Sequence, residues 1–232
     1  MSENRDLTPL MAIVDADVAA RAGWPILDLA AAYLRGGVRL IQLRAKSMPA
    51  DAYLATASAL VQLARRYSES GLGVPAQSPA RVIVNDRADI ARLAQADGVH
   101  VGQDDLPAAA VRGLVGDAAI VGLSTHSTEQ VDRAVLEPVS YVAIGPVFAT
   151  ATKATGYDSV GLEMVKQAAR RANARGLPLV AIGGITLERA ASVLDAGAAS
   201  VAVIGDLLAG GDPEARARAY LERLSRSEPP RV

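Results

Sequence analysis

The feature that most constrains the fold is a regular alternation of short apolar runs with segments of helical spacing. Val82–Val84 is a β-branched run, Ala88–Gln95 has helical spacing, and Gly98–Val101 is a second apolar run. A strand, helix and strand of this kind form a parallel unit, which brings both carboxyl ends to the same edge of a sheet. Eight such strand and helix pairs follow one another, and they predict a single α/β domain of the (β/α)8 TIM barrel type.

The expected units lie end to end along the chain. The expected strands cover Met11–Val14, Val38–Leu43, Val82–Val84, Gly98–Val101, Ala119–Leu123, Tyr141–Ile144, Leu179–Ile182 and Ser200–Ile204. The expected helices cover Ile26–Arg35, Ala50–Tyr67, Ala88–Gln95, Leu106–Leu114, Thr128–Leu136, Met164–Arg175, Leu187–Ala196 and Pro213–Leu224. No linker divides residues 1–232, so we expect one domain with a core of about residues 9–224 and a frayed tail at 225–232. A doubly wound open sheet is the alternative, but the chain has no Gly-x-Gly-x-x-Gly fingerprint.

Composition excludes several classes of protein. The formal charge is −1, from 24 basic and 25 acidic residues, so no basic surface for nucleic acid is expected. There is no cysteine, which excludes disulfides, thiolate catalysis and cysteine-ligated zinc. Residues 1–10 lack an apolar signal core, and no uncharged apolar run is long enough to span a membrane. We therefore expect a soluble, cytoplasmic protein without a nucleic-acid or membrane partner.

Acidic residues follow the ends of the third and fourth expected strands. Asp86 lies directly after one strand, and Asp105 lies in the Gly-Gln-Asp-Asp segment after the next. Because parallel strands bring their carboxyl ends to one edge, we expect the two carboxylates to be neighbours. Mg²⁺ usually takes one or two carboxylates together with phosphate oxygens, so this pair is a candidate site for one ion. The alternative is that both segments are only turns and helix caps.

Basic residues are expected at the same edge of the barrel. Arg44 and Lys46 lie two apart at the end of the second expected strand, so both side chains can point the same way. Lys153 lies in a long loop after the sixth expected strand. Arg binds phosphate oxygens through two parallel hydrogen bonds and Lys acts as a point charge, so these residues favour a diphosphate ligand. A solvated pair and an exposed loop lysine are the alternatives.

Glycines follow the last two expected strands. Gly183 and Gly184 come after the seventh strand, and Ile204-Gly205 comes at the end of the eighth. Backbone N–H groups and a helix N-terminus commonly hold a phosphate at this place in a TIM barrel. The two loops therefore predict a second anion site, suited to a monophosphate. Glycines that only end strands are the alternative.

The chain has two histidines, which limits acid–base chemistry. His100 lies inside the fourth expected strand and favours a core or supporting role, whereas His126 lies near the rim and is the plausible acid–base group. Their spacing permits neither a nucleophile–base–acid triad nor a histidine metal cluster. A reaction that mainly needs charge neutralisation of a leaving group fits better than hydrolysis.

Six segments together resemble the thiamine-phosphate synthase family, also called thiamine-phosphate pyrophosphorylases. They are QLRAK (42–46), VND (84–86), DGVHVGQDD (97–105), GLSTH (122–126), GPVFATATK (145–153) and AIGGIT (181–186), in the family's order. The resemblance implies a transferase that couples 4-amino-2-methyl-5-(diphosphooxymethyl)pyrimidine with a thiazole monophosphate. The products would be thiamine monophosphate and pyrophosphate, formed by a Mg²⁺-assisted dissociative substitution.

The resemblance also implies a role for each matching residue. Asp86 and Asp105 would carry one Mg²⁺ ion, and Gln42 would lie beside the pyrimidine. The residues expected to hold the diphosphate are Arg44, Lys46, Asn85, Ser124 and Lys153, with Thr150 and Thr152 beside them in the loop. Of these, Arg44, Lys46, Ser124 and Lys153 would be catalytic. The backbone of Gly184, Ile204 and Gly205 would face the thiazole phosphate.

Two positions depart from the family pattern. The eighth strand of the family usually ends in Ile-Ser, whereas this chain has Ile204-Gly205, so a phosphate-binding hydroxyl is missing and weaker binding of the thiazole phosphate is expected. The first strand lacks the usual Tyr and Thr and has Met11 and Val14 near those places, which leaves the packing beside the pyrimidine open.

Three other functions compete with the synthase. A thiazole tautomerase on the same barrel would use His126 as a base and would have no use for a diphosphate site. A non-catalytic phosphate-ligand sensor would be stabilised by its ligand without turnover. A phosphate-binding isomerase would share the glycine loops but would not explain Arg44, Lys46 and Lys153. The sequence leaves open the oligomeric state, a homodimer included, the presence of a carboxylate on the thiazole, and the choice between Mg²⁺ and Mn²⁺.

Overall fold

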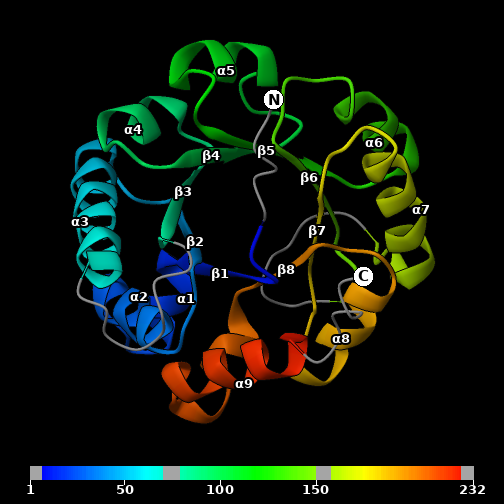
Figure 1. The fold of residues 1–232 in the computed structure, drawn as a ribbon. Coiled ribbons are helices and arrows are strands. Elements are labelled where there is room, and N and C mark those ends of the chain that lie inside the picture. The colour runs from blue at the N-terminus through cyan, green and yellow to red at the C-terminus, as the bar shows by residue number, and fades with distance from the viewer. Residues whose placement is uncertain (1–6, 70–78, 150–157, 226–232) are drawn as a thin grey trace.

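A computed structural model describes residues 7–69, 79–149 and 158–225. Within these residues eight parallel strands form a closed barrel in sequence order, as expected (Figure 1). The strands are β1 (Leu10–Asp15), β2 (Leu40–Arg44), β3 (Arg81–Asn85), β4 (Gly98–Val101), β5 (Ile120–Thr125), β6 (Tyr141–Ile144), β7 (Leu179–Ile182) and β8 (Ser200–Val203). The barrel closes where β8 pairs with β1, with Leu10 opposite Val201 and Ala12 opposite Val203. The predicted (β/α)8 barrel is therefore confirmed.

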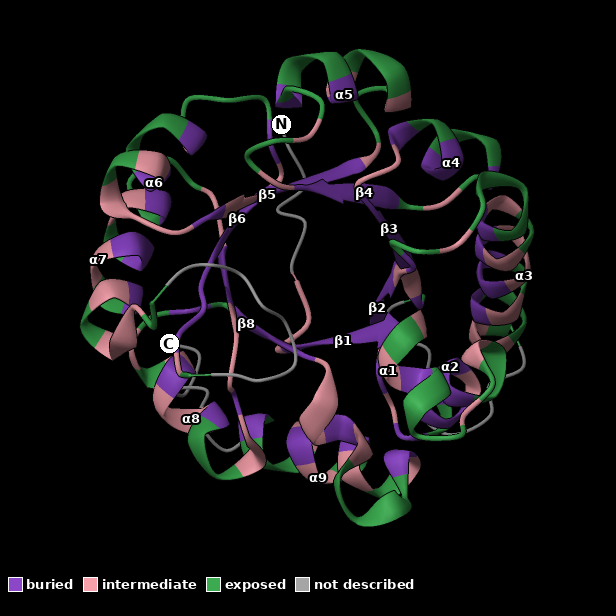
Figure 2. Cartoon of the chain, turned by 180° about the vertical axis from the view of Figure 1, so that it is seen from behind, coloured by how far each residue is buried: buried purple, intermediate pink, exposed green. Residues whose placement is uncertain are grey.

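Helices surround the barrel as an outer ring. They are α1 (Ala16–Arg21), α2 (Ile26–Arg35), α3 (Ala50–Glu69), α4 (Ala88–Leu93), α5 (Ala108–Val115), α6 (Thr128–Ala134), α7 (Gly161–Asn173), α8 (Leu187–Asp195), η1 (Gly205–Gly211) and α9 (Pro213–Ser225). Figure 2 shows purple, buried residues along the strands and green, exposed residues on the helices. Each helix thus presents one face to the sheet and another to solvent, which is the arrangement that amphipathic spacing predicts.

Buried side chains form two layers, one on each side of the sheet. The inner layer consists of Met11, Ile13, Leu40, Ile83, Ile120, Tyr141, Ala143, Val180 and Ala202. The outer layer packs strand residues such as Ala12 and Val14 against the helices. Successive strand residues point to opposite faces, and both faces are covered here. For this reason the strands read as continuous apolar runs.

Two short helical segments were not expected from the sequence. α1 begins directly after β1, where Asp15 Oδ1 accepts a hydrogen bond from Val18 N at 3.0 Å and caps the helix. η1 follows β8 in the glycine-rich segment GDLLAGG, which has no clear helical periodicity. Other ends shift by a few residues, so that β8 ends at Val203 and α7 begins at Gly161. Residues 226–232 of the expected tail lie outside the described residues.

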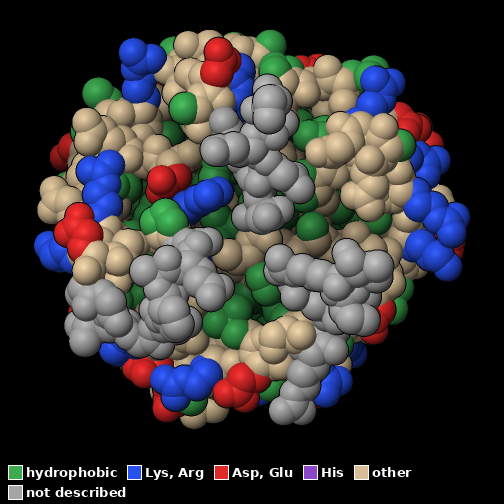
Figure 3. All heavy atoms as spheres, viewed as in Figure 1, with side chains coloured by type: hydrophobic (Ala, Val, Ile, Leu, Met, Phe, Trp, Pro, Cys, Tyr) green, Lys and Arg blue, Asp and Glu red, His purple; other side chains and the backbone are tan. Residues whose placement is uncertain are grey.

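The surface carries charges of both signs. Figure 3 shows Lys and Arg side chains beside Asp and Glu side chains around the periphery, with apolar side chains nearer the centre. Ion pairs join Arg35 to Glu214 at 2.7 Å and Arg171 to Asp132 at 3.0 Å. In the described parts of the chain, no helix is both long and apolar enough to cross a membrane.

Candidate active site

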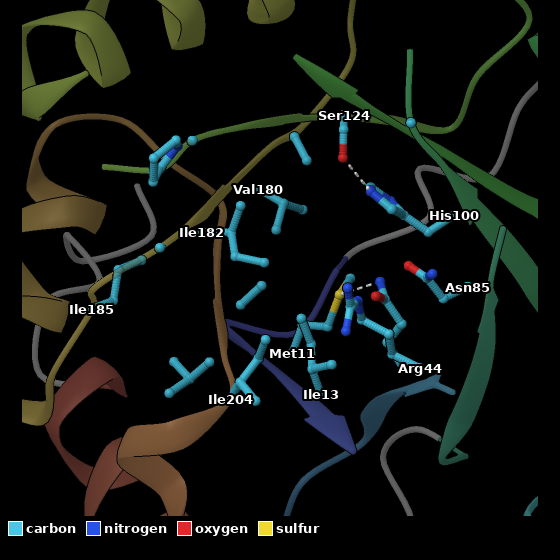
Figure 4. Close-up of a pocket in the computed structure, with 18 of the residues that line it drawn as sticks. Met11, Ile13, Arg44, Asn85, His100, Ser124, Val180, Ile182, Ile185 and Ile204 are labelled. Carbon is cyan, nitrogen blue, oxygen red and sulfur yellow. Dashed lines mark hydrogen bonds between the residues drawn. The ribbon is translucent and has the colours of Figure 1, made fainter. Parts of the chain in front are cut away.

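A cavity of about 680 Å³ opens at the carboxyl ends of the strands, and all eight strands contribute side chains to it. In Figure 4, Arg44, Asn85, His100 and Ser124 lie on one side of the cavity. The opposite side is apolar and includes Val180, Ile182, Ile185 and Ile204. The site therefore has a polar half built by β2–β5 and an apolar half built mainly by β7 and β8.

A pair of carboxylates, Asp86 and Asp105, lies at the polar edge of the cavity. Asp105 Oδ2 accepts a hydrogen bond from Gly102 N at 2.7 Å. Burial raises the pKa of Asp105, and the nearby Asp86 carboxylate raises it further, against the opposing effects of the Gly102 hydrogen bond and of Lys46. The two acids are therefore neighbours, as the strand order predicts. Asp86 also has a left-handed backbone with φ of 63°, which is uncommon outside glycine and is adopted more readily by Asp and Asn than by other residues.

The residues present fit a divalent cation. Asp105, whose pKa is raised by burial and by the neighbouring Asp86 carboxylate, suits a hard cation in place of a proton, because a cation neutralises the two adjacent negative charges. Among the described residues, no group of three or more acidic or His side chains is placed to hold an ion by itself. A pair such as Asp86 and Asp105 suits Mg²⁺ when phosphate oxygens complete the coordination.

Two basic side chains border this acid pair. Lys46 Nζ lies 3.1 Å from Asp86 Oδ2, and its side chain is about half exposed. Arg44 forms an ion pair with Asp15, whose carboxylate is buried and also caps α1. The α1 cap thus fixes the acid that holds Arg44 in the cavity wall. The sequence places Asp15 at a strand end, but no pattern around it indicates this role.

Tyr53 joins the ends of β2 and β3. Its hydroxyl donates to the Leu43 carbonyl at 2.9 Å and accepts from Asn85 N at 3.2 Å. This contact from α3 fixes the backbone beside both Arg44 and Asn85. No sequence pattern indicates that Tyr53 reaches these strands.

His100 lies in the cavity wall and was not among the expected site residues. Its Nδ1 lies 2.8 Å from the Tyr141 hydroxyl, and its Nε2 lies 2.7 Å from Ser124 Oγ (Figure 4). Burial raises the pKa of Tyr141, so that hydroxyl keeps its proton. Strand alternation was an available signal, because Val99 and Val101 pack outward and His100 must then point inward. The expected supporting role of His100 agrees with these contacts.

His126 also lines the cavity, as expected from its place near the rim. Its Nδ1 lies 2.6 Å from the Gly145 carbonyl oxygen, and its backbone N donates to Gln130 Oε1 at 2.6 Å. Because a carbonyl only accepts, Nδ1 carries the proton in this contact.

The glycine loops after β7 and β8 lie together in the apolar half. Gly183 and Gly184 have φ values of 101° and 61°, and a Cβ on Gly184 would lie 2.6 Å from the Ala149 carbonyl oxygen. Both positions therefore require glycine. Asp206 Oδ2 accepts from Leu187 N at 3.1 Å and joins the two loops. Ile204 and Gly205 line the same region of the cavity, as expected.

The structure brings together most of the expected site. The cavity lining includes Gln42, Arg44, Lys46, Asn85, Asp86, Asp105, Ser124, Gly184, Ile204 and Gly205. Gln42 Nε2 lies 3.7 Å from Met11 Sδ at the cavity floor. Thr150, Thr152 and Lys153 lie outside the described residues. Arg189 of α8 also lines the cavity, although no sequence pattern singles it out.

Fold and site define a class, namely TIM-barrel proteins with an acid pair, basic residues and glycine loops at one mouth, suited to phosphorylated ligands. The model of the thiamine monophosphate synthase family matches residues 10–207. The chain is 44% identical over 197 residues to the thiamine-phosphate synthase of Roseiflexus castenholzii, a match that covers 85% of this chain and 80% of that protein. It is 43% identical over 210 residues to that of Thermus thermophilus, covering 89% and 94%. This chain belongs to the thiamine monophosphate synthase family.

Comparison of structures agrees with this assignment. The thiamine phosphate pyrophosphorylase from Pyrococcus furiosus superposes with a TM-score of 0.80 and 27% sequence identity. The match covers 97% of this chain and 98% of that one. The resemblance predicted from the sequence is therefore confirmed.

Proposed function

We propose that this protein is a thiamine-phosphate synthase, a transferase that joins a pyrimidine and a thiazole. The substrates are 4-amino-2-methyl-5-(diphosphooxymethyl)pyrimidine and a thiazole monophosphate, and the products are thiamine monophosphate and pyrophosphate. The observation that carries the proposal is the two-sided cavity. Acidic and basic groups around Asp86, Asp105, Arg44 and Lys46 form one half, and an apolar wall with glycine loops forms the other.

The polar half suits the diphosphate leaving group. Arg44 is held by Asp15 and can present its remaining N–H donors to diphosphate oxygens. Ser124 Oγ, which contacts His100 Nε2, adds a hydroxyl from the facing strand. When bound at Asp86 and Asp105, Mg²⁺ supplies Lewis-acid stabilisation of the leaving charge. Lys153 completes this set in the proposal, with Thr150 and Thr152 in the same loop.

The apolar half suits the nucleophile. The thiazole nitrogen has a lone pair, so the protein does not need a strong base to activate it. The protein instead holds the two rings at reacting distance, and positioning of this kind is a large catalytic effect. Gln42, at the cavity floor beside Met11, lies where it can bind the pyrimidine. The backbone of Gly184, Ile204 and Gly205 would bind the monophosphate.

A thiazole tautomerase is the second candidate, and His126 is the observation that favours it. Its Nδ1 contact with the Gly145 carbonyl leaves Nε2 as the basic ring nitrogen. However, a tautomerase does not use a metal or a diphosphate, so it leaves Arg44 and the Asp86 and Asp105 pair without a role. A phosphate-binding isomerase leaves them unexplained as well, and a non-catalytic sensor would bind the ligands without releasing pyrophosphate.

Pyrophosphate release from purified protein tests the proposal. With both substrates and Mg²⁺, we expect release that stops with EDTA and falls about 100-fold or more in Asp86→Ala, because Lewis-acid stabilisation of the leaving group is lost. A fluorinated pyrimidine that destabilises a cation should react more slowly, as dissociative substitution requires. Arg170→Ala, an exposed change on α7, is the control and should keep full activity. No release from a folded protein that still binds thiazole phosphate would instead favour the tautomerase.

Three further properties belong to the same proposal. Residues 1–232 form one domain in it, the protein acts in the cytoplasm, and a homodimer is the assembly to be tested. Light scattering measures the molar mass in solution and so tests the homodimer. A monomer at the protein concentration used in the activity assay would contradict it.

A further inference from the structure

Arg189 is a cation in the wall of the apolar half of the cavity. It lies in the first turn of α8, where its N donates to the Thr186 carbonyl at 3.0 Å. Its guanidinium carbon lies 4.9 Å from the centre of the Phe148 ring. Stacking on an aromatic face holds a guanidinium plane in place and leaves its N–H edges available for an anion.

Phe148 connects Arg189 to the glycine loop after β7. Phe148 N donates to the Gly183 carbonyl at 3.0 Å. A Cβ on Gly184 would lie 2.8 Å from Phe148 Cβ, so Gly184 packs directly against this residue. The guanidinium of Arg189 is therefore held over a ring that borders the backbone proposed to bind the monophosphate.

Two acids from α8 and η1, Glu188 and Asp206, form ion pairs with Arg216. Asp206 Oδ2 accepts from Leu187 N, from Arg216 Nη2 at 2.8 Å and from the Tyr220 hydroxyl at 2.6 Å. Glu188 lies 3.8 Å from Arg216 and is largely exposed. Within the described residues, neither acid forms an ion pair with Arg189. Among the described residues, no ion pair with these two acids therefore occupies the guanidinium of Arg189, and its N–H donors can serve an anion in the cavity that it lines.

The absence of a side chain at Gly205 explains why a cation is useful at this place in the cavity. The loop after β8 ends at a residue without a side chain, so it offers a phosphate only backbone N–H groups there. An Arg fork binds phosphate oxygens through parallel, charge-assisted hydrogen bonds, which are stronger than neutral ones. Arg189 lies in the first turn of α8, directly after the loop that follows β7, and lines the same cavity.

We infer that Arg189 binds the monophosphate of the thiazole substrate and sets the preference of this site for a phosphorylated ligand. The inference rests on the proposed function, because it assigns that phosphate to the loops after β7 and β8. Arg189 is then a substrate-binding residue of the apolar half, as Arg44 is of the polar half.

The test compares Arg189→Gln and Arg189→Lys with Arg170→Gln, an equal loss of charge on the exposed face of α7. In Arg189→Gln we expect the KM for thiazole monophosphate to rise about 10-fold or more, since the charge-assisted hydrogen bonds to the phosphate are lost. Arg189→Lys keeps the charge, so its KM for thiazole monophosphate should lie between that of the wild type and that of Arg189→Gln. The KM for the pyrimidine diphosphate should stay within about twofold, because Arg189 lies outside the polar half.

The alcohol form of the thiazole, without phosphate, separates phosphate binding from general packing. Its KM should be the same in wild type and in Arg189→Gln. An unchanged KM for the monophosphate in Arg189→Gln would overturn the inference, and so would an equal rise for monophosphate and alcohol. If Arg189 only packs on Phe148 and does not bind phosphate, one of these two results is expected.

Calorimetric binding of thiazole monophosphate alone keeps this test separate from the coupling reaction. If the wild-type protein binds the monophosphate but releases no pyrophosphate with both substrates, the proposed function is contradicted. Weaker binding in Arg189→Gln would still support the assignment of Arg189 in that case. Equal affinity in the two proteins, or no binding to the wild type, would overturn it.

Discussion

At the scale of single residues, Asp105 is a carboxyl group whose charged form is made unfavourable by its surroundings. Burial and the Asp86 carboxylate raise the pKa of Asp105, so its charged form is less favourable in the folded protein than in the unfolded chain. As pH rises from the ordinary value of 3.8 through the raised value, the unfolded chain loses its proton first. The free energy of unfolding therefore falls across this window and stays lowered at neutral pH.

Asp105→Asn should separate stability from activity. The amide oxygen can still accept from Gly102 N, but the charge is gone, so we expect the metal-free variant to be at least as stable as the wild type at pH 7. The gain should disappear below the ordinary pKa, where the wild-type carboxyl is also neutral. We expect activity to fall about 100-fold, since the variant lacks one of the two carboxylates proposed to hold Mg²⁺. Urea denaturation at several pH values measures the first effect, and a variant less stable than wild type at every pH would contradict it.

At the scale of elements, β5 leaves room for an aromatic side chain from β6. Gly122 lies beside Tyr141 in the sheet, and a Cβ at Gly122 would lie 2.1 Å from Tyr141 Cζ and 2.6 Å from His100 Nδ1. Tyr141 fills the barrel and stacks on His100 with ring centroids 5.5 Å apart. The glycine is therefore a packing requirement of three neighbouring strands.

Gly122→Ala should destabilise the fold and disturb the site together. We expect a loss of about 3 kcal/mol in the free energy of unfolding, because over-packing a core displaces side chains that have nowhere to move. The displaced His100 should also lower activity, since it contacts Ser124. Gly113→Ala on α5 is the matched control: its Cβ would meet nothing within 4 Å, and alanine favours a helix. If the two variants unfold at the same denaturant concentration, the packing argument fails.

At the scale of the whole molecule, the cavity is shared by all eight strands of a closed barrel. A ligand that binds at the mouth therefore contacts residues far apart in the sequence, such as Arg44 and Gly184, only when the barrel is closed. Binding to the folded state alone raises the free energy of unfolding by mass action.

Mg²⁺ and pyrophosphate together should stabilise the entire fold. At about 100 times the dissociation constant, the gain is about 2.7 kcal/mol. For a chain of this size it raises Tm by about 5–10 °C in a thermal scan. The Mg²⁺-dependent part should vanish in the double variant Asp86→Asn/Asp105→Asn, while Arg170→Ala should keep it. A Mg²⁺-dependent shift that persists in the double variant would place the cation elsewhere.

The sequence by itself determined the barrel and most of the site. Continuous apolar strands and amphipathic helices can bury their faces only in layers, and the order of the chain then brings every strand end to one rim. This is why the positions of Asp86, Asp105 and Arg44 at strand ends are enough to predict that they share one site.

Only the tertiary structure decided how these groups are held and which others join them. The contacts of Asp15 with Arg44 and of Tyr53 with the ends of β2 and β3 join distant segments. The cavity positions of His100 and Arg189 depend on packing against Tyr141 and Phe148. Local sequence patterns report which face a residue takes on its own element, whereas contacts between elements depend on register and packing that no short segment contains.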